Sequence, residues 1–243
     1  MANLILNDAH DPMGAAIFDY YHYGKADTLH VFSSLMEEDE IPVSELFRDF
    51  NSMPYLEQVA LQYAHGHILD VGAGSGCHSL ALIQMEKQPY AIDISPLAVS
   101  VMRARGVNAH VRNFFDSQFQ QKFDTILLLM NGSGIIGRLE NINTFFSRVR
   151  QLLNPHGFVL MDSTDVRYLF EEEDGSIKID LADDYYGQFD FKMCYKNIIG
   201  KSFDWLYIDF ETLSYYAEMN GFWVEYLAKG SHYDYLAKIY PSN

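Results

Sequence analysis

Three glycines in five residues follow a short apolar run in the stretch HILDVGAGSGCHSLAL, residues 67–82. Gly72 allows a tight turn, Gly74 lacks a Cβ and so lets a ligand lie on the backbone, and Gly76 opens the next helix. In open α/β sheets, ligands bind beyond the carboxyl ends of the strands, where such turns occur. The spacing therefore predicts the floor of a ligand-binding site.

Two classes of cofactor bind to a glycine-rich loop of this kind. The dinucleotide fingerprint G-x-G-x-x-G, counted from Gly72, requires a third glycine at position 77, where this chain has Cys77. Asp93 follows roughly 20 residues after the glycines and ends a short apolar run, and either class of cofactor would use a carboxylate there for its ribose. Cys77 thus disfavours an NAD(P)-dependent oxidoreductase, which remains an alternative.

Apolar runs of strand length alternate with helical patterns from residue 67 onward. The predicted strands are HILDV, PYAID, NAHVR, FDTILLLM and GFVLMD. Strands separated by helices form βαβ units, so the chain predicts a doubly wound, mostly parallel sheet in an α/β fold. After Asp162, two apolar-aromatic runs split by IGK predict an antiparallel hairpin inserted at about residues 163–208. A helix from Asp209 to Met219 and a last pair of strands complete the chain.

The first 65 residues predict a helical N-terminal lid or extension, which precedes one domain over residues 66–243. Asp11 is typical of a helix N-cap, with Pro12 at the first helical position. A second helix is expected from about Pro54.

The 243-residue chain carries 17 basic and 33 acidic residues, a net charge of −16. Because nucleic-acid binding depends on Lys and Arg at the phosphates, this charge argues against a nucleic-acid partner. Two cysteines suit a reducing cytosol, and the longest apolar run has the length of a strand rather than of a membrane span. The chain also starts without the pattern of a secretory signal, and its histidines lack the spacing of metal ligands. We expect a cytoplasmic protein with no membrane partner and no metal.

The segment LDVGAGSG, residues 69–76, resembles the first motif of the class I S-adenosylmethionine-dependent methyltransferases. The similarity extends from about residue 67 to the C-terminus. It implies a seven-stranded sheet of order 3-2-1-4-5-7-6 with the last strand antiparallel. It also implies S-adenosylmethionine as the cofactor and S-adenosylhomocysteine as the product. A nicotinamide domain would usually end in a parallel strand instead.

The resemblance further implies where the cofactor lies. Its methionine part would lie on the glycine loop, formed by Asp70, Gly72, Ala73 and Gly74. Its ribose and adenine would lie at the ends of the next two strands, beside Asp93, Ile94, Asn113 and Phe114, with Asp116 as an alternative to Asn113. An amide oxygen can still accept the adenine amino proton. Met130 and Asn131 would border both cofactor and substrate.

Methyl transfer from a sulfonium is an in-line displacement, so an enzyme can work by aligning the two partners and excluding water. A general base is needed only if the acceptor is protonated. Candidates for this role are Tyr21 and His22 in the N-terminal segment, and Asp162 after the fifth strand. Arg48 is a candidate partner for the cofactor's carboxylate. The alternatives are a core-packed helix around Tyr21, a capping role for Asp162 and a surface position for Arg48.

The predicted function is methyl transfer to a small-molecule acceptor, or to a protein side chain as the less favoured option. The chain lacks the tetrapeptide of amino-methylating nucleic-acid enzymes, an Asp or Asn followed by two prolines and an aromatic residue. Because a fold alone does not establish activity, a non-catalytic cofactor-binding module is also an alternative. The aromatic insert, residues 189–210, predicts either a cap over an apolar substrate pocket or a homodimer surface.

Overall fold

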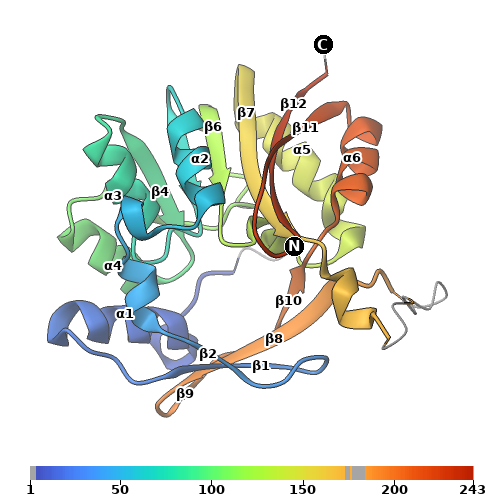
Figure 1. Cartoon of the computed structure of the whole chain (residues 1–243). Coiled ribbons are helices and arrows are strands. Elements are labelled where there is room, and N and C mark those ends of the chain that lie inside the picture. The colour runs from blue at the N-terminus through green and yellow to red at the C-terminus, as the bar shows by residue number, and fades with distance from the viewer. Residues whose placement is uncertain (1–3, 173–175, 177–183, 243) are drawn as a thin grey trace.

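The computed structural model of the chain describes residues 4–172, 176 and 184–242. Its main part is a seven-stranded sheet with helices on both faces, and a second, smaller sheet lies across the carboxyl ends of the central strands (Figure 1). Part of the predicted inserted cap, residues 173–175 and 177–183, lies outside the described residues.

The main sheet has the strand order β11-β12-β7-β6-β3-β4-β5. Its strands are β3 (Ile68–Val71), β4 (Pro89–Asp93), β5 (Ala109–Val111), β6 (Phe123–Leu128), β7 (Leu153–Thr164), β11 (Phe222–Lys229) and β12 (Asp234–Pro241). β5, β4, β3, β6 and β7 pair in parallel, whereas β12 is antiparallel to both of its neighbours. Numbered along the chain within this sheet, the order is 3-2-1-4-5-7-6, which confirms the predicted fold class.

Helices cover both faces of the main sheet, because its central strands are apolar on both sides. α2 (Tyr55–Tyr63) and α3 (Cys77–Gln84) pack on one face, and α5 (Ile142–Leu152) and α6 (Phe210–Met219) pack on the other. α4 (Pro96–Ala104) packs against β4 and β5. Along β3, Ile68 packs on the face covered by α2 and α3, and Leu69 packs on the face covered by α5 and α6. Successive side chains of a strand point to opposite faces of the sheet.

Two helices begin where the sequence predicts a cap. Asp11 accepts a hydrogen bond from Gly14 N at the start of α1 (Pro12–Tyr23), and Asp209 accepts one from Thr212 N at the start of α6. Each carboxylate satisfies an amide that the first helical turn leaves without a partner. α1 buries its apolar face against α4 and the second sheet, and so it joins the two parts of the molecule.

The second sheet has the order β10-β8-β1-β2, and β9 pairs with β8. Its strands are β1 (Leu29–Ser33), β2 (Asp39–Ile41), β8 (Gln188–Tyr195), β9 (Ile198–Ile199) and β10 (Phe203–Leu206). β8 is antiparallel to both β9 and β10, which confirms the hairpin that the sequence predicts in the insert.

The N-terminal segment contains the predicted helices, α1 and α2, and also two strands that the sequence analysis does not predict. β1 and β2 form a hairpin within that segment, and β1 pairs with β8, with Leu29 opposite Tyr195. The run LHVFS is short, and its partner strand lies far along the chain, so no local pattern marks it as a strand. The N-terminal segment and the insert therefore form one cap rather than two separate additions.

Short 3₁₀ helices connect these elements: η1 (Asp8–His10), η2 (Val43–Phe47), η3 (Phe50–Ser52), η4 (Gly132–Ile136), η5 (Leu139–Asn141) and η6 (Val166–Phe170). Two of them lie at the carboxyl edge of the main sheet. η4 follows β6 there, and η2 contacts the glycine loop through a hydrogen bond from Ser75 Oγ to Leu46 O.

Candidate functional site

The glycine loop joins β3 to α3 at the carboxyl edge of the main sheet. Gly72, Gly74 and Gly76 have φ of 66°, 55° and 85°, a conformation that glycine adopts without strain. A Cβ at Gly72 would meet no atom within 4 Å, and one at Gly74 would meet only Ile17 Cδ1, at 3.9 Å. The backbone at these two glycines is therefore open to a ligand, with α1 as the nearest wall.

Asp70 and Ala73 support the loop from behind. Asp70 is buried and accepts a hydrogen bond from Ser79 Oγ at 2.6 Å, and burial raises its pKa. Ala73 N donates to Ile92 O at 3.1 Å, and the side chain of Ala73 is buried against α4. Both residues thus shape the loop and contact the protein interior.

Asp93 ends β4 directly beside the glycine loop. Gly74 N donates to its Oδ2 and Ser95 N to its Oδ1, both at 2.9 Å. Burial raises the pKa of Asp93 to about 6; the two amides lower it, and the nearby carboxylates of Asp11 and Asp70 raise it further. The carboxylate is fixed in place, and no ion pair joins it to a cation among the described residues, so donors from a ligand would stabilise its ionised form.

The predicted adenine side of the site is crossed by the N-terminal residues. Leu6 N donates to Ile94 O at 2.9 Å, and Asn113 Nδ2 donates to Leu4 O at 3.2 Å. Asn113 Oδ1 accepts from Phe115 N at 2.8 Å. Asn113 therefore holds both the N-terminal segment and its own turn, a role that the sequence does not indicate.

Phe114 and Asp116 also have partners within the protein. Phe114 is buried in the core, with its ring centroid 6.1 Å from that of Phe145. Asp116 Oδ2 lies 2.9 Å from Arg112 NH1 in an ion pair. Asp116 thus stabilises the turn after β5, whereas Asn113 lies beside the segment that crosses Ile94.

The loop after β6 has an unusual backbone. Met130 and Asn131 both have positive φ, of 66° and 56°. Asn131 Oδ1 accepts a hydrogen bond from Thr164 Oγ1 at 2.7 Å, and Gly132 N donates to Asp162 Oδ1 at 2.9 Å. Side chains at the end of β7 therefore hold this strained turn, a pattern common near ligand sites. The side chain of Met130 is left exposed beside it.

The structure separates the three candidates for a general base. Asp162 lies at the carboxyl edge, where burial raises its pKa to about 6 against the effect of two backbone amides. Tyr21 and His22 lie on the exposed last turns of α1. Tyr21 is near Arg105 at the end of α4, and the ring of His22 packs 4.2 Å from that of Phe18. Arg105 NH1 donates to Ser75 O in the glycine loop at 2.6 Å, so Tyr21 lies near a residue that contacts this loop.

Arg48 belongs to a buried cluster behind the glycine loop that the sequence does not reveal. Its NH2 lies 2.6 and 2.5 Å from the two carboxylate oxygens of Glu57, and His78 Nε2 lies 2.7 Å from Glu57 Oε2. The exposed fractions of the three side chains are only 10%, 6% and 7%. Arg48 is therefore a buried cation rather than a surface residue.

The cap is fixed to the carboxyl edge at η4. The indole of Trp205 in β10 lies against Gly134, where a Cβ would be 1.9 Å from Trp205 Cε2. Ser133 Oγ lies 2.7 Å from Leu206 O and 2.8 Å from Ser163 Oγ. These buried contacts join the cap, η4 and the end of β7 next to the loop after β6.

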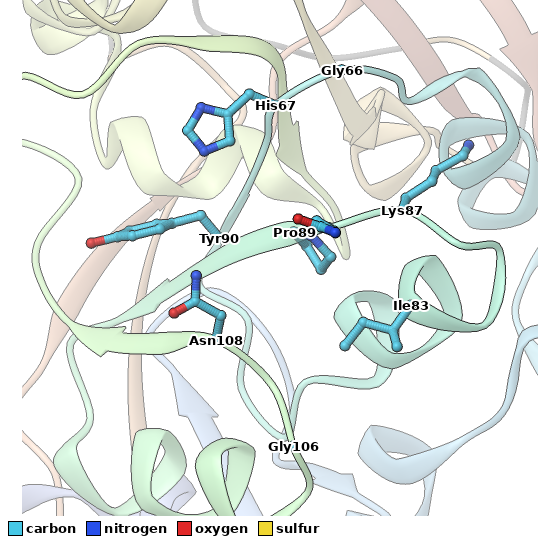
Figure 2. Close-up of a pocket in the computed structure, with 9 residues that line it drawn as sticks. Gly66, His67, Ile83, Lys87, Pro89, Tyr90, Gly106 and Asn108 are labelled. Carbon is cyan, nitrogen blue, oxygen red and sulfur yellow. The ribbon is translucent and has the colours of Figure 1, made fainter.

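A cavity of about 540 Å³ lies at the opposite edge of the sheet, at the amino ends of β3 and β4. Figure 2 shows His67, Tyr90 and Asn108 around it, with the ammonium of Lys87 turned away from them. That ammonium donates to Leu61 O at 2.7 Å. Because ligands of open α/β sheets bind at the carboxyl ends of the strands, this cavity does not coincide with the predicted cofactor site.

Within residues 4–172, 176 and 184–242, no group of three or more His, Cys, Asp or Glu side chains could hold a metal ion. Both cysteines are free thiols, and burial raises the pKa of Cys77 to about 11. No helix in these described ranges has the length and apolar character needed to span a bilayer.

Comparison with known proteins agrees with this geometry. The family described as a methyltransferase domain matches residues 63–209, more than half of the chain. A SAM-dependent methyltransferase from Bacteroides fragilis, solved in complex with S-adenosyl-L-homocysteine, is 59% identical to this chain, with a TM-score of 0.95 and 99% of each chain covered. The chain therefore belongs to the S-adenosylmethionine-dependent methyltransferases. It is an enzyme of this class, and S-adenosylmethionine is its cofactor.

More distant structures share the fold alone. The CcbJ methyltransferase from Streptomyces caelestis is 12% identical, with a TM-score of 0.63, and 98% of this chain and 100% of that chain are covered. The sugar N-methyltransferase KedS8 from Streptoalloteichus sp ATCC 53650 is 14% identical, with a TM-score of 0.56 and coverages of 87% and 98%. None of the curated proteins matches the chain. The family match and the 59% identical structure support a methyltransferase rather than the alternative of an NAD(P)-dependent oxidoreductase.

Proposed function

We propose that this methyltransferase acts on a small-molecule acceptor bound between the carboxyl edge of the main sheet and the cap. The docking of the cap carries the proposal, because Trp205 and Leu206 contact η4 beside the loop after β6. A cover fixed at this place suits an acceptor that can be enclosed and kept from water. The net charge of −16 disfavours a nucleic-acid acceptor. A protein side chain is the less favoured option.

We assign the cofactor to the open face of the glycine loop. The space over Gly72 and Gly74 supports a place there for its methionine part, and the fixed carboxylate of Asp93 is adjacent for the ribose hydroxyls. The residues assigned to contact the cofactor are Gly72, Gly74, Asp93, Ile94, Asn113, Met130, Asn131 and Arg48. Asp70, Ala73 and Phe114 are assigned to support these residues from the interior.

S-adenosylmethionine supplies a methyl group that its sulfonium already activates. The chain's own residues then have to hold the acceptor in line and exclude water. Asp162 is the favoured candidate to accept a proton from a protonated acceptor, because it lies at the carboxyl edge with a pKa raised by burial to about 6. Its hydrogen bond from Gly132 N means that it also fixes the loop beside the acceptor.

The aromatic residues of the insert favour a cap over a homodimer surface. Phe189 is only 3% exposed, and its ring packs edge-on against Tyr207 with 5.4 Å between centroids. These rings therefore pack against each other within the cap. The two free thiols suit a reducing cytosol, which is the location that we propose.

Methyl-labelled cofactor and a size-fractionated cell extract test the acceptor class. The proposal predicts label in the low-molecular-weight fraction, with none in nucleic acid. Label confined to the protein fraction would overturn the small-molecule assignment. Asp93→Asn is the matched control with reduced labelling at limiting cofactor, because it weakens the proposed ribose contact and leaves the cap unchanged.

A further inference from the structure

The N-terminal segment is joined to the carboxylate at the end of β4 through one serine. Ser95 N donates to Asp93 Oδ1 at 2.9 Å, and Ser95 Oγ donates to Asp11 Oδ2 at 2.5 Å. We propose that Asp11 is a positioning residue for Asp93 and acts on it through Ser95. The start of α1 is thereby a working part of the cofactor site. The inference rests on the proposed assignment of Asp93 to the ribose of the cofactor.

Ser95 is a buried residue whose hydroxyl makes two hydrogen bonds. As the N-cap of α4, its Oγ accepts a hydrogen bond from Ala98 N at 2.9 Å. A hydroxyl has one proton to donate, and Asp11 accepts it. Asp11 comes from a distant part of the chain, so it ties Ser95 to the start of α1 as well as to that of α4. The backbone amide that donates to Asp93 is therefore fixed from both helices.

The first turn of α1 leaves room for this contact. Asp11 is fully buried, and its Oδ1 accepts a hydrogen bond from Gly14 N at 2.8 Å. Burial raises the pKa of Asp11, while the hydrogen bonds from Ser95 and Gly14 lower it. A Cβ at Gly14 would lie 2.2 Å from both Asp11 Oδ2 and Ser95 Oγ. Glycine destabilises a helix relative to alanine, so the contact between Asp11 and Ser95 gives this glycine a physical reason.

Asp11 orients the carboxylate of Asp93 before the ligand arrives. Two backbone amides hold that carboxylate, one from the glycine loop and one from Ser95. Leu6 N also donates to Ile94 O, so the N-terminal segment contacts both residues that follow Asp93. A carboxylate that is already oriented loses less conformational freedom when the ribose hydroxyls bind. The gain in affinity therefore falls on ligands that carry these hydroxyls.

Two ligands separate positioning from a structural role. S-adenosylhomocysteine carries both ribose hydroxyls, and its 2′,3′-dideoxy analogue carries neither. Calorimetry gives both dissociation constants for the wild type, Asp11→Ala and Gly14→Ala. Gly14→Ala keeps Asp11 and Ser95 but places a methyl group in their contact. The control is Ser100→Ala, which removes an exposed hydroxyl from the same helix as Ser95.

Loss of this contact should weaken S-adenosylhomocysteine binding about fivefold in Asp11→Ala and in Gly14→Ala, the effect of one hydrogen bond. The affinity for the dideoxy analogue should stay within about twofold, because that ligand presents no hydroxyl to Asp93. Asp11→Ala combined with Asp93→Asn should bind S-adenosylhomocysteine as Asp93→Asn alone does, since Asp11 acts through Asp93. Ser95→Ala breaks the same contact with the Asp11 cap in place, so the test does not depend on the folding of Asp11→Ala.

An equal loss of affinity for both ligands in Asp11→Ala would mean a structural role and would overturn the inference, as would additive losses with Asp93→Asn. A wild type that binds both ligands equally well would overturn the assignment of Asp93 to the ribose. A wild type that prefers S-adenosylhomocysteine, with the same preference in Asp11→Ala and Gly14→Ala, would keep that assignment and remove only the role of Asp11.

Discussion

Asp93 is the side chain on which we expect the cofactor affinity to depend most. Its carboxylate is held by two backbone amides beside the glycine loop, and burial raises its pKa to about 6. Asp93→Asn should weaken S-adenosylhomocysteine binding by about 1.5–3 kcal/mol, because a charged acceptor is lost. Wild-type affinity should also fall as the pH drops below about 6, since a protonated carboxyl is a poorer acceptor for the ribose hydroxyls.

Calorimetric titrations between about pH 5 and about pH 8, a range that brackets this pKa, compare the two proteins. The affinity of Asp93→Asn should change little over this range. Parallel pH profiles for wild type and variant would mean that another group controls the affinity.

Asp162 should affect the stability of the folded protein, whereas Asp93 should affect the affinity for the cofactor. Its pKa is about 6 in the folded protein because of burial, above the value of about 3.9 for a free Asp, so the folded state holds its proton more tightly. Stability from this group is therefore present below about pH 4 and is lost as the pH rises through about 6. Asp162→Asn cannot ionise. Relative to wild type, its free energy of unfolding should rise by about 3 kcal/mol between low and neutral pH.

Urea denaturation of both proteins at several pH values measures this difference. A constant offset between them at every pH would contradict the prediction. Any effect of the amide on the contact with Gly132 N shifts both ends of the range equally, and so it does not affect the comparison.

The cap sheet is the element that we expect to control turnover. Gly134→Ala would push a methyl group into the indole of Trp205 and displace β10 from η4. Overpacking of this kind costs about 1–3 kcal/mol, and turnover should fall because the cap no longer closes beside the acceptor. Trp205→Leu should partly restore both quantities in the double variant, since the clash is relieved. Additive losses in the double variant would show that the two residues are not coupled.

The N-terminal segment is a second element at the site. Leu6 and Leu4 are joined by hydrogen bonds to Ile94 and Asn113 across the ends of β4 and β5. Deletion of residues 1–6 should make S-adenosylhomocysteine dissociate faster, because a cover of the adenine side is removed. The melting temperature should change little, since the Asp11 cap of α1 remains. Stopped-flow dissociation measures the rate, and an unchanged rate would exclude a covering role.

At the scale of the whole molecule, the main sheet could be predicted because strands and helices alternate along the chain. The tight turn at Gly72 and Gly74, with Asp93 beside it, could also be predicted, because the glycine spacing is local and Asp93 ends the next strand. The pairing of β1 with β8 could not be predicted, since its two strands are far apart in sequence.

Long-range packing also explains the buried cluster that the sequence does not reveal. Glu57 and His78 come from α2 and α3, and only the folded chain brings them to Arg48. A carboxylate among the apolar residues of α2 was the one available signal of this cluster.

The central claim is that the cofactor lies on the glycine loop at the carboxyl edge of the main sheet. A crystal structure of the complex with S-adenosylhomocysteine tests it most directly. We expect the ligand against the backbone of Gly72 and Gly74, with its ribose hydroxyls within hydrogen-bond distance of Asp93. A nucleoside in the cavity beside Tyr90 at the opposite edge, or a ribose without contact to Asp93, would contradict the claim.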